Sequence, residues 1–350
     1  MAIDKITTAS ITDANITTAK LAYDAIPFRN IIINGDMSLA QRATSVTGIT
    51  STSYNTVDRF QTVASSLGTW TQSQDTDVPT GQGFAKSLKM DCTTADGSPS
   101  SGDELYLRQK FEGQNLQYLK KGTANAESTT LSFWVKSNKT GTYICQLLDI
   151  DNTRSISKSY TISSANTWEK KTITFPGDTT GALDNNNARS LDCIFWLGAG
   201  SDNTSGTLQT SWGSRVVANT AVGQVNLADS TSNEWYVTGV QLEAGTTASD
   251  FEFLPVDVNF YRCARYYLKE SQGRYGAAID YSNGASSDVN WDIRAVSQFR
   301  SDGYTVTYTQ QNASASVQRK SQLGFNITGS ATSTSGGAYL NTGWEVSDEL

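Results

Sequence analysis

A five-residue repeat occupies the first 26 residues of the chain. A large aliphatic residue returns at every fifth position, and Thr follows it in the first three units. This spacing matches neither the 3.6-residue period of an α-helix nor the two-residue period of a single strand. A segment of this length can bury such a stripe only in a solenoid-like coil or against copies of itself from other chains. The repeating positions are Ile6, Ile11, Ile16, Leu21 and Ile26.

The alternative interpretation is a polar, Thr/Ala-rich tail without fixed structure, whose period arose by chance. We favour the repeat because its register does not slip anywhere between residues 6 and 26. The sequence therefore predicts that residues 1–27 form an attachment and trimerisation segment. It leaves open whether the pentads form a β-type coil or interlocked extended chains.

The composition favours a β-rich protein with a polar, weakly charged surface. Hydrophobic residues make up 37% of the chain and charged residues only 17%, while Ser, Thr, Asn and Gly are frequent. Such usage is typical of strands and turns rather than of exposed helices. The formal net charge of −7, without any long Lys/Arg cluster, argues against a nucleic-acid partner.

No apolar stretch approaches the roughly 20 residues that a membrane-spanning helix needs, so we expect no membrane insertion. The first residues carry no basic segment followed by an apolar run, and we expect no secretory signal.

The chain contains no histidine. This excludes Ser-His-Asp and Cys-His nucleophilic catalysis, His-ligated zinc or iron, and haem with a proximal His. The four cysteines form no closely spaced pair, so neither a zinc knuckle nor a redox motif is available. Cys145 and Cys193 lie inside apolar runs, where we expect free, buried thiols. We expect no cofactor.

Residues 28–254 read as antiparallel β structure. Residues 30–36 are an apolar run that ends at an Asn-Gly turn. Strict alternation over 128–137 places Leu131, Phe133 and Val135 on one face of a strand, and Ser132, Trp134 and Lys136 on the other. Similar runs follow at 143–150, 168–175, 191–197 and 235–242. About ten short strands without an intervening helix predict a β-sandwich or jelly roll.

The pattern changes after residue 254. Apolar positions 260, 263, 264, 267 and 268 follow helical spacing, which predicts a linking helix over 255–270 with Asp257 as its N-cap. Alternation returns at 304–308 and 323–327, and a turn is expected at 333–337 before further strand-like runs at 338–340 and 343–346. We therefore expect a C-terminal β tip domain over 271–350. At about eighty residues it is small enough to gain stability from oligomeric contacts.

These predictions describe a mainly β protein: an antiparallel β-sandwich or jelly roll with a short N-terminal pentad-repeat segment, a linking helix and a small C-terminal β domain. Several segments also carry a family resemblance. Residues 29–37, 40–42 and 57–60 resemble the opening of a domain common in bacteriophage tail-fibre and related virion proteins. The resemblance continues through residues 131–136, 165–171, 195–197, 235–245, 251–253 and 263–267. The pentads and residues 343–350 are similar to fibre amino termini and tips.

The resemblance implies a carbohydrate-binding-like jelly roll in a homotrimeric fibre. Such a subunit is made in the bacterial cytoplasm, is released by lysis and resides in the virion. It contacts other virion proteins through residues 1–27 and host cell-surface polysaccharide through its β domains. The family's ligand contacts vary, so no binding residue carries over to a position of this chain.

Sugar recognition needs an aromatic face against C–H groups, with polar neighbours for the hydroxyls. Trp134 is the first candidate because its strand position sets it opposite the apolar residues, with Lys136 beside it. Trp212 and Trp70 lie in polar, loop-like contexts and are further candidates. Each tryptophan also has a structural interpretation, as packing under a loop or against another chain. Trp196 is flanked by apolar residues and is expected in the core.

Clustered oxygen ligands at Asp178, Asp184 and Asn186 suit Ca²⁺, although an ordinary Asx-rich turn is the favoured interpretation. Asp149 and Asp151 share one strand face, as a paired-carboxylate glycosidase would require, but a solvated turn explains them better. We predict no catalytic residues and no enzyme activity.

The leading hypothesis is a trimeric phage fibre that recognises host glycan. A purely structural or decorative capsid or tail fibre without a specific ligand is the alternative. A glycan-degrading tailspike is less favoured, because no long catalytic body is visible in the sequence.

Overall fold

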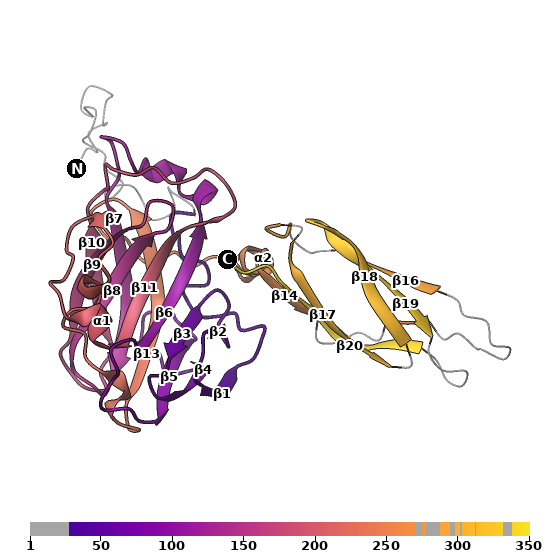
Figure 1. Ribbon diagram of the computed structural model, residues 1–350, viewed down its shortest axis with the longest axis horizontal. Coiled ribbons are helices and arrows are strands. Elements are labelled where there is room, and N and C mark those ends of the chain that lie inside the picture. The colour runs from indigo at the N-terminus through magenta and orange to yellow at the C-terminus, as the bar shows by residue number, and fades with distance from the viewer. Residues whose placement is uncertain are drawn as a thin grey trace, which may run out of the picture.

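The computed structural model describes residues 28–270, 275–277, 288–294, 298–301, 303–311, 313–331 and 338–350. The repeating positions of the pentad segment and the expected turn at 333–337 lie outside the described residues. The described chain forms two β-rich parts along the long axis of the molecule, with helix α2 (Val256–Ala264) between them (Figure 1).

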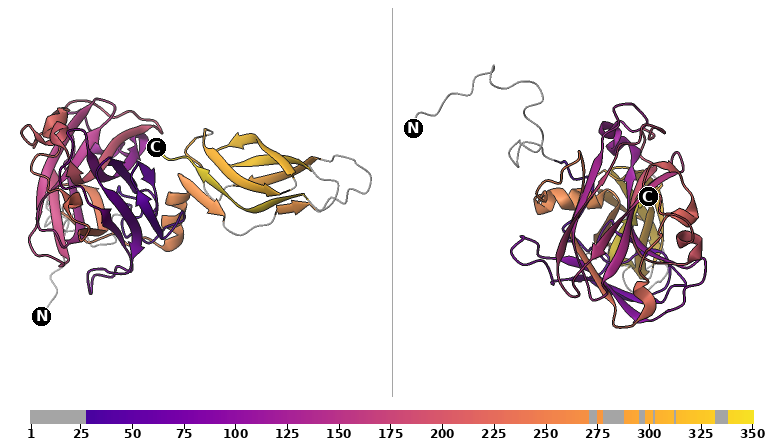
Figure 2. Two further views of the ribbon diagram at one scale, coloured as in Figure 1. Left: turned by 60° about the horizontal axis from the view of Figure 1, so that its bottom comes forward. Right: turned by 90° about the vertical axis from the view of Figure 1, so that its left-hand side faces the viewer.

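The larger part is a sandwich of two antiparallel sheets (Figures 1 and 2). Sheet A contains, in spatial order, β1 (Ser45–Ile49), β4 (Thr69–Asp75), β5 (Ser87–Thr94), β13 (Glu234–Ala244), β7 (Thr129–Ser137) and β10 (Glu169–Phe175). Sheet B contains β12 (Gly213–Ser214), β9 (Arg154–Ile162), β8 (Gly141–Asp149), β11 (Arg189–Ala199), β6 (Glu104–Glu112), β3 (Gln61–Ser65) and β2 (Ser53–Tyr54). This architecture confirms the predicted mainly β sandwich or jelly-roll class.

The core lies between the two sheets and follows from strand alternation. Leu131, Phe133 and Val135 of β7 are fully buried, as predicted. The Phe133 ring meets Phe195 of sheet B edge to face, with 5.1 Å between ring centroids. Cys145 and Cys193 are free thiols in this core, as expected from the sequence.

Short helices occupy the connections of the sandwich. They are η4 (Gly113–Asn115), η5 (Gln117–Leu119), α1 (Ser201–Thr204), η6 (Val217–Asn219) and η7 (Leu227–Asp229). Each is only one turn long, so the prediction that no substantial helix interrupts the strands is confirmed.

The apolar run at 30–33 does not form a strand, contrary to the sequence interpretation. Side chains rather than a neighbouring strand satisfy most of its backbone. Asn30 Oδ1 accepts from the Ile32 amide, and Gln109 Oε1 accepts from the Ile33 amide. The turn at Asn34 does form, closed by a hydrogen bond from the Met37 amide to the Asn34 carbonyl (3.0 Å). Polar side chains, Asn30 within the run and Gln109 from β6, therefore outcompeted sheet pairing.

Helix α2 confirms the predicted linking helix but is shorter than expected. Pro255, not Asp257, occupies the N-cap position, with Asp257 in the first turn. The helix ends at Ala264, since residues from 267 onward pair with β20 instead. The Pro255 carbonyl already accepts the first helical hydrogen bond, from the Asn259 amide (3.0 Å), so the cap lies two residues before the predicted one.

The C-terminal part contains two further antiparallel sheets. In one, β20 (Ala338–Ser347) pairs with β14 (Tyr267–Glu270), β15 (Tyr275–Ala277) and β17 (Thr305–Gln311). In the other, β19 (Gly324–Ala331) lies between β16 (Asp288–Arg294) and β18 (Ala313–Ser321). The core of this C-terminal part contains Phe299, Tyr304, Phe325, Ile327, Trp344 and Val346. The runs at 338–340 and 343–346 belong to one strand, β20. Within the described residues, none of the helices is both long and apolar enough to cross a membrane.

Candidate functional site

The outer face of sheet A carries a cluster of aromatic and charged side chains where β7, β13 and β10 lie side by side. Alternation along β7 turns Trp134 and Lys136 away from the core. The β13 register places Tyr236 opposite Lys136 and Thr238 opposite Trp134. On the other side of β7, Lys170 of β10 lies opposite Trp134.

Trp168 and Asp77 complete this cluster. The Trp168 indole Nε1 donates a hydrogen bond to Asp77 Oδ1 (2.9 Å), and the Lys136 ammonium forms an ion pair with Asp77 Oδ2. The same Lys136 nitrogen lies 4.1 Å from the centroid of the Tyr236 ring, close enough for a cation–π contact. We call Trp134, Lys136, Trp168, Tyr236 and Asp77 the aromatic face.

The charges of the aromatic face are largely neutralised within it. Burial favours the neutral form of Asp77, but hydrogen bonds from Lys136 and Trp168 outweigh it and lower the pKa of that carboxyl group. A second ion pair joins Lys89 to Glu234 (2.8 Å), and Glu234 also accepts from the Tyr236 hydroxyl (3.0 Å). Burial first, then the bond to Glu234, raises the pKa of Tyr236 to about 12. The face therefore suits an uncharged, hydroxyl-rich ligand.

Trp134 and Trp168 are both partly exposed. Their rings offer apolar surfaces to the C–H groups of a sugar, and the exposed Asp77 carboxylate can accept from its hydroxyls, whereas the Lys136 side chain is buried and holds Asp77 in place. The sequence predicted Trp134 and Lys136, and the structure brings them together. It missed Trp168, Tyr236 and Asp77. Strand parity would have placed Trp168 on the face of Lys170, two positions later, but nothing local identifies Asp77.

Trp212 lies elsewhere, near the edge where β9 and β10 approach each other. Its indole donates to the Pro176 carbonyl (2.8 Å), and the Lys121 ammonium lies 5.1 Å from its ring centroid. It is partly exposed, and its contacts with Pro176 and Lys121 are not with residues of the aromatic face.

Trp70 is fully buried, so the structure excludes it as a glycan-binding candidate and favours the structural interpretation. Along β4 the polar residues Thr69 and Thr71 face outward, which turns Trp70 into the core, where its indole donates to the Leu67 carbonyl (2.7 Å). Polar neighbours in a strand mark the opposite face, not a loop. Trp196 is buried as expected, but outside the main core: it packs against Tyr106 in a separate apolar cluster on sheet B that also contains Ala221.

The calcium candidates occupy different surroundings. Asp178 accepts from Arg154 through both carboxylate oxygens (2.8 and 2.9 Å) and pairs with Lys121 (3.0 Å). Two cations therefore already neutralise it. Asp184 and Asn186 are exposed and bond each other weakly at 3.4 Å. Among the residues that the structure describes, no group of three or more His, Cys, Asp or Glu side chains could hold a metal ion.

Asp149 and Asp151 do not form a matched pair of carboxylates. Asp149 is buried against Lys121, whereas Asp151 is exposed and accepts from the Asp184 amide (2.9 Å).

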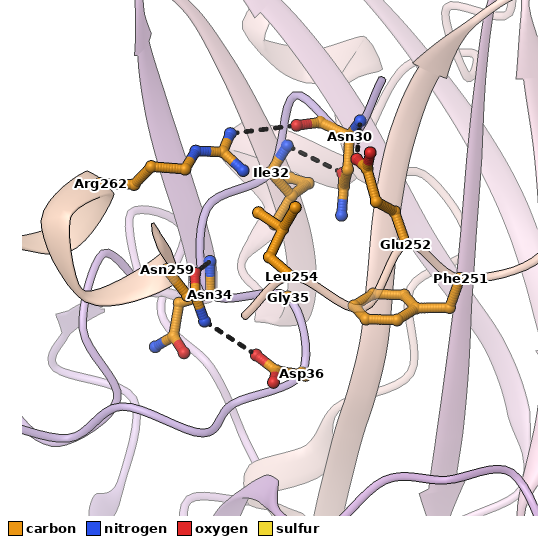
Figure 3. Close-up of a pocket in the computed structure, with 10 residues that line it drawn as sticks. All are labelled: Asn30, Ile32, Asn34, Gly35, Asp36, Phe251, Glu252, Leu254, Asn259 and Arg262. Carbon is orange, nitrogen blue, oxygen red and sulfur yellow. Dashed lines mark hydrogen bonds between the residues drawn. The ribbon is translucent and has the colours of Figure 1, made fainter. Parts of the chain in front are cut away.

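The opening segment, residues 30–36, lines a small pocket beside helix α2 (Figure 3). Asn30 donates its amide to Glu252 (2.9 Å) and accepts at its carbonyl from Arg262 (3.1 Å), while Asn259 bonds both Asn34 and Asp36. The cavity measures about 10 Å³, enough for one water molecule at most. These bonds therefore attach the opening segment to β13 and α2. The cavity that they surround is too small for a ligand.

No family model and no curated protein sequence matches the chain. Among solved structures, the enzymatically active domain of tailspike protein 4 from bacteriophage CBA120 is 14% identical, with a TM-score of 0.32. The similarity covers 63% of this chain and 22% of that one. A family 11 carbohydrate-binding module from Clostridium thermocellum, in complex with a mixed-linked tetrasaccharide, is 11% identical, with a TM-score of 0.29. That match covers 59% of this chain and 99% of the module. A family 30 carbohydrate-binding module is 10% identical, with a TM-score of 0.31, over 65% of this chain and 93% of that one.

Proposed function

We propose that this protein is a glycan-binding phage fibre subunit and that the aromatic face of sheet A contacts the saccharide. The observation that carries the proposal is the grouping of two partly exposed tryptophans, Trp134 and Trp168, with Lys136 and Asp77 on one side of sheet A. Strand β7 holds Trp134 and Lys136, and the bonds of Asp77 to Trp168 and Lys136 hold the other two groups, so the ligand does not have to order them on binding.

The fibre role rests on the pentad repeat and on the resemblance of the opening and closing segments to phage fibres. In this role residues 1–27 join the chain to other virion proteins, and three chains associate. Three linked copies of a weak site bind a repetitive polysaccharide far more tightly than one copy. Light scattering on the full-length protein should give about three times the 37.8 kDa chain mass. A monomeric mass contradicts the trimer.

The proposed role is binding without cleavage. Asp149, the buried member of the one carboxylate pair singled out in the sequence, is neutralised by Lys121 and is poorly placed to transfer a proton. Release of reducing sugar ends from host polysaccharide by the pure protein would overturn this part of the proposal and favour a tailspike activity.

Depletion of labelled full-length protein by host cells tests the proposal. We expect intact cells to remove the protein from solution, and cells stripped of surface polysaccharide to leave it there. Depletion by neither cell type, from a folded trimeric sample, would favour a structural or decorative fibre.

Substitutions then locate the site. Trp134→Ala and Trp168→Ala should each weaken binding about three- to tenfold, the loss expected for one aromatic contact. Trp212→Ala is the matched control, since it removes another partly exposed tryptophan that lies off the aromatic face. If all three folded variants bind equally well, the aromatic face is not the site.

A further inference from the structure

A cleft of about 490 Å³ lies between the sandwich and helix α2, away from the outer strand positions that form the aromatic face. Its volume falls in the range of small-ligand sites, roughly 300–1,000 Å³. Phe28 borders it from the start of the described chain, Tyr118 from η5, and Arg262 from α2. Three segments distant in the sequence thus converge on one concave surface.

Two aromatic side chains on the cleft are unusually exposed. Phe28 is 61% and Tyr118 is 47% accessible to solvent. Large apolar side chains exposed beside a cleft are more informative than scattered ones, because they offer contact area to a ligand. The amide side chains of Gln114 and Asn115 border the same cleft and are exposed, so they add hydrogen-bonding groups for hydroxyls.

The charges of the cleft do not cancel. Glu112 accepts two hydrogen bonds from Arg265 (both 2.8 Å), so these two residues neutralise each other. Arg262 donates to the Asn30 carbonyl (3.1 Å) but forms no ion pair with any residue that the structure describes. Glu112, Arg262 and Arg265 are the charged residues that line the cleft, which leaves it with one net positive charge.

The Arg262 guanidinium also bears a desolvation cost. Burial lowers the pKa of Arg262, and the nearby Cys263 thiol and Glu252 carboxylate offset this only in part. A carboxylate in the cleft would supply the missing counter-charge, and the planar guanidinium suits it because two N–H groups can donate in parallel.

We propose that this cleft binds a carboxylate-bearing sugar, such as a uronic acid unit of an acidic polysaccharide. Arg262 bonds the carboxylate, and the rings of Phe28 and Tyr118 contact the C–H faces of the sugar. The site is independent of the aromatic face, so the chain would carry two saccharide sites of different charge preference.

Calorimetric titration of the full-length protein at low salt, with methyl glucuronide and methyl glucoside, tests the proposal. The two sugars differ in their charge at C6. We expect the glucuronide to bind at least about tenfold more tightly, the gain typical of a charge-assisted hydrogen bond, and added salt to weaken it. Equal affinities, or no binding of either sugar at millimolar concentration, would overturn the proposal. If another part of the fibre fills the cleft, neither sugar will bind.

Variants separate the site from a general loss of folding. Arg262→Gln should reduce glucuronide affinity about tenfold or more. Because Arg262 also holds the Asn30 carbonyl, Tyr118→Ala provides a second test at an exposed position. Tyr261→Ala is its matched control: Tyr261 is 50% exposed on the same helix as Arg262 but does not line the cleft. Trp134→Ala should leave glucuronide binding unchanged, which distinguishes this site from the aromatic face. Unchanged binding in both Arg262→Gln and Tyr118→Ala contradicts the assignment.

Discussion

Arg59 of the sandwich forms an ion pair with Glu349, across 290 residues of sequence. The Arg59 side chain is 1% exposed and stacks on the Tyr266 ring, with its guanidinium carbon 3.5 Å from the ring centroid. It also donates to the Lys110 carbonyl (2.8 Å), while Lys110 in turn donates to the carbonyl of Leu350. The last residues of the described chain are therefore bonded directly to the turn before β3 and to β6 of sheet B.

Glu349→Gln should destabilise the protein strongly, by about 3–5 kcal/mol, because it leaves the buried Arg59 cation without its counter-charge. Glu127→Gln is the control, since the Glu127–Lys120 pair has side chains that are 42% and 53% exposed. That change should cost about 0–1 kcal/mol. Denaturant unfolding of both variants measures the difference. Equal costs would mean that water reaches Arg59 and that the contact contributes little.

A second charged contact, from α2 to β6, predicts acid sensitivity. Burial acts to raise the pKa of Glu112, but hydrogen bonds from Arg265 and Tyr266 outweigh it, so the pKa is lowered on folding. Such a group contributes stability above its unfolded pKa and loses it as the pH falls through the folded value. The stability lost in Glu112→Gln should therefore be large at pH 7 and shrink below about pH 4. Unfolding free energies of both proteins over that range test this. A difference that does not change with pH contradicts it.

Asp58 should show the opposite pH dependence. Burial raises its pKa to about 6, although hydrogen bonds from Gln41 oppose the shift. A raised folded pKa contributes stability that is complete below 3.8 and is lost as the pH rises through about 6. The stability of the wild type relative to Asp58→Asn should thus decrease as the pH rises from 3.8 to about 6. The same unfolding series checks this prediction, and a rising difference would show that Asp58 stays ionised in the folded state.

Strand alternation predicted more of the fold than of the site. The β7 pattern in residues 128–137 correctly assigned which side chains face the core, because one buried face fixes strand register. The same rule, had it been applied to Thr69 and Thr71, would have placed Trp70 inside. The error came from reading polar neighbours as a loop.

The aromatic face depends on contacts that local sequence does not encode. Asp77 bonds Trp168 and Lys136 across 91 and 59 residues, respectively. Only the spatial order of the strands, in which β13 lies between β5 and β7, brings these segments together. The apolar run at 30–33 does not form a strand for a related reason: two side chains that bond its backbone, Gln109 and Glu252, lie 76 and 222 residues away.

Gly35 lies in the turn after that run and packs closely against β13. A Cβ atom at this position would lie 2.1 Å from the Val240 carbonyl oxygen and 3.1 Å from its carbon, both of them backbone atoms of β13. The Val240 amide also donates to the Gly35 carbonyl (2.9 Å), so the turn cannot move away without breaking this bond. Gly35→Ala should therefore cost about 1–3 kcal/mol or more, as other overpacked sites do.

Gly97→Ala is the matched control, because an added Cβ there meets no atom within 4 Å. Its effect should stay within about 0.5 kcal/mol, as for most surface changes. Denaturation midpoints of the two variants decide the matter. Equal midpoints would mean that the opening segment can lift off β13 at little cost. The bonds that Asn30 and Asn34 make around the small pocket would then contribute little to holding it.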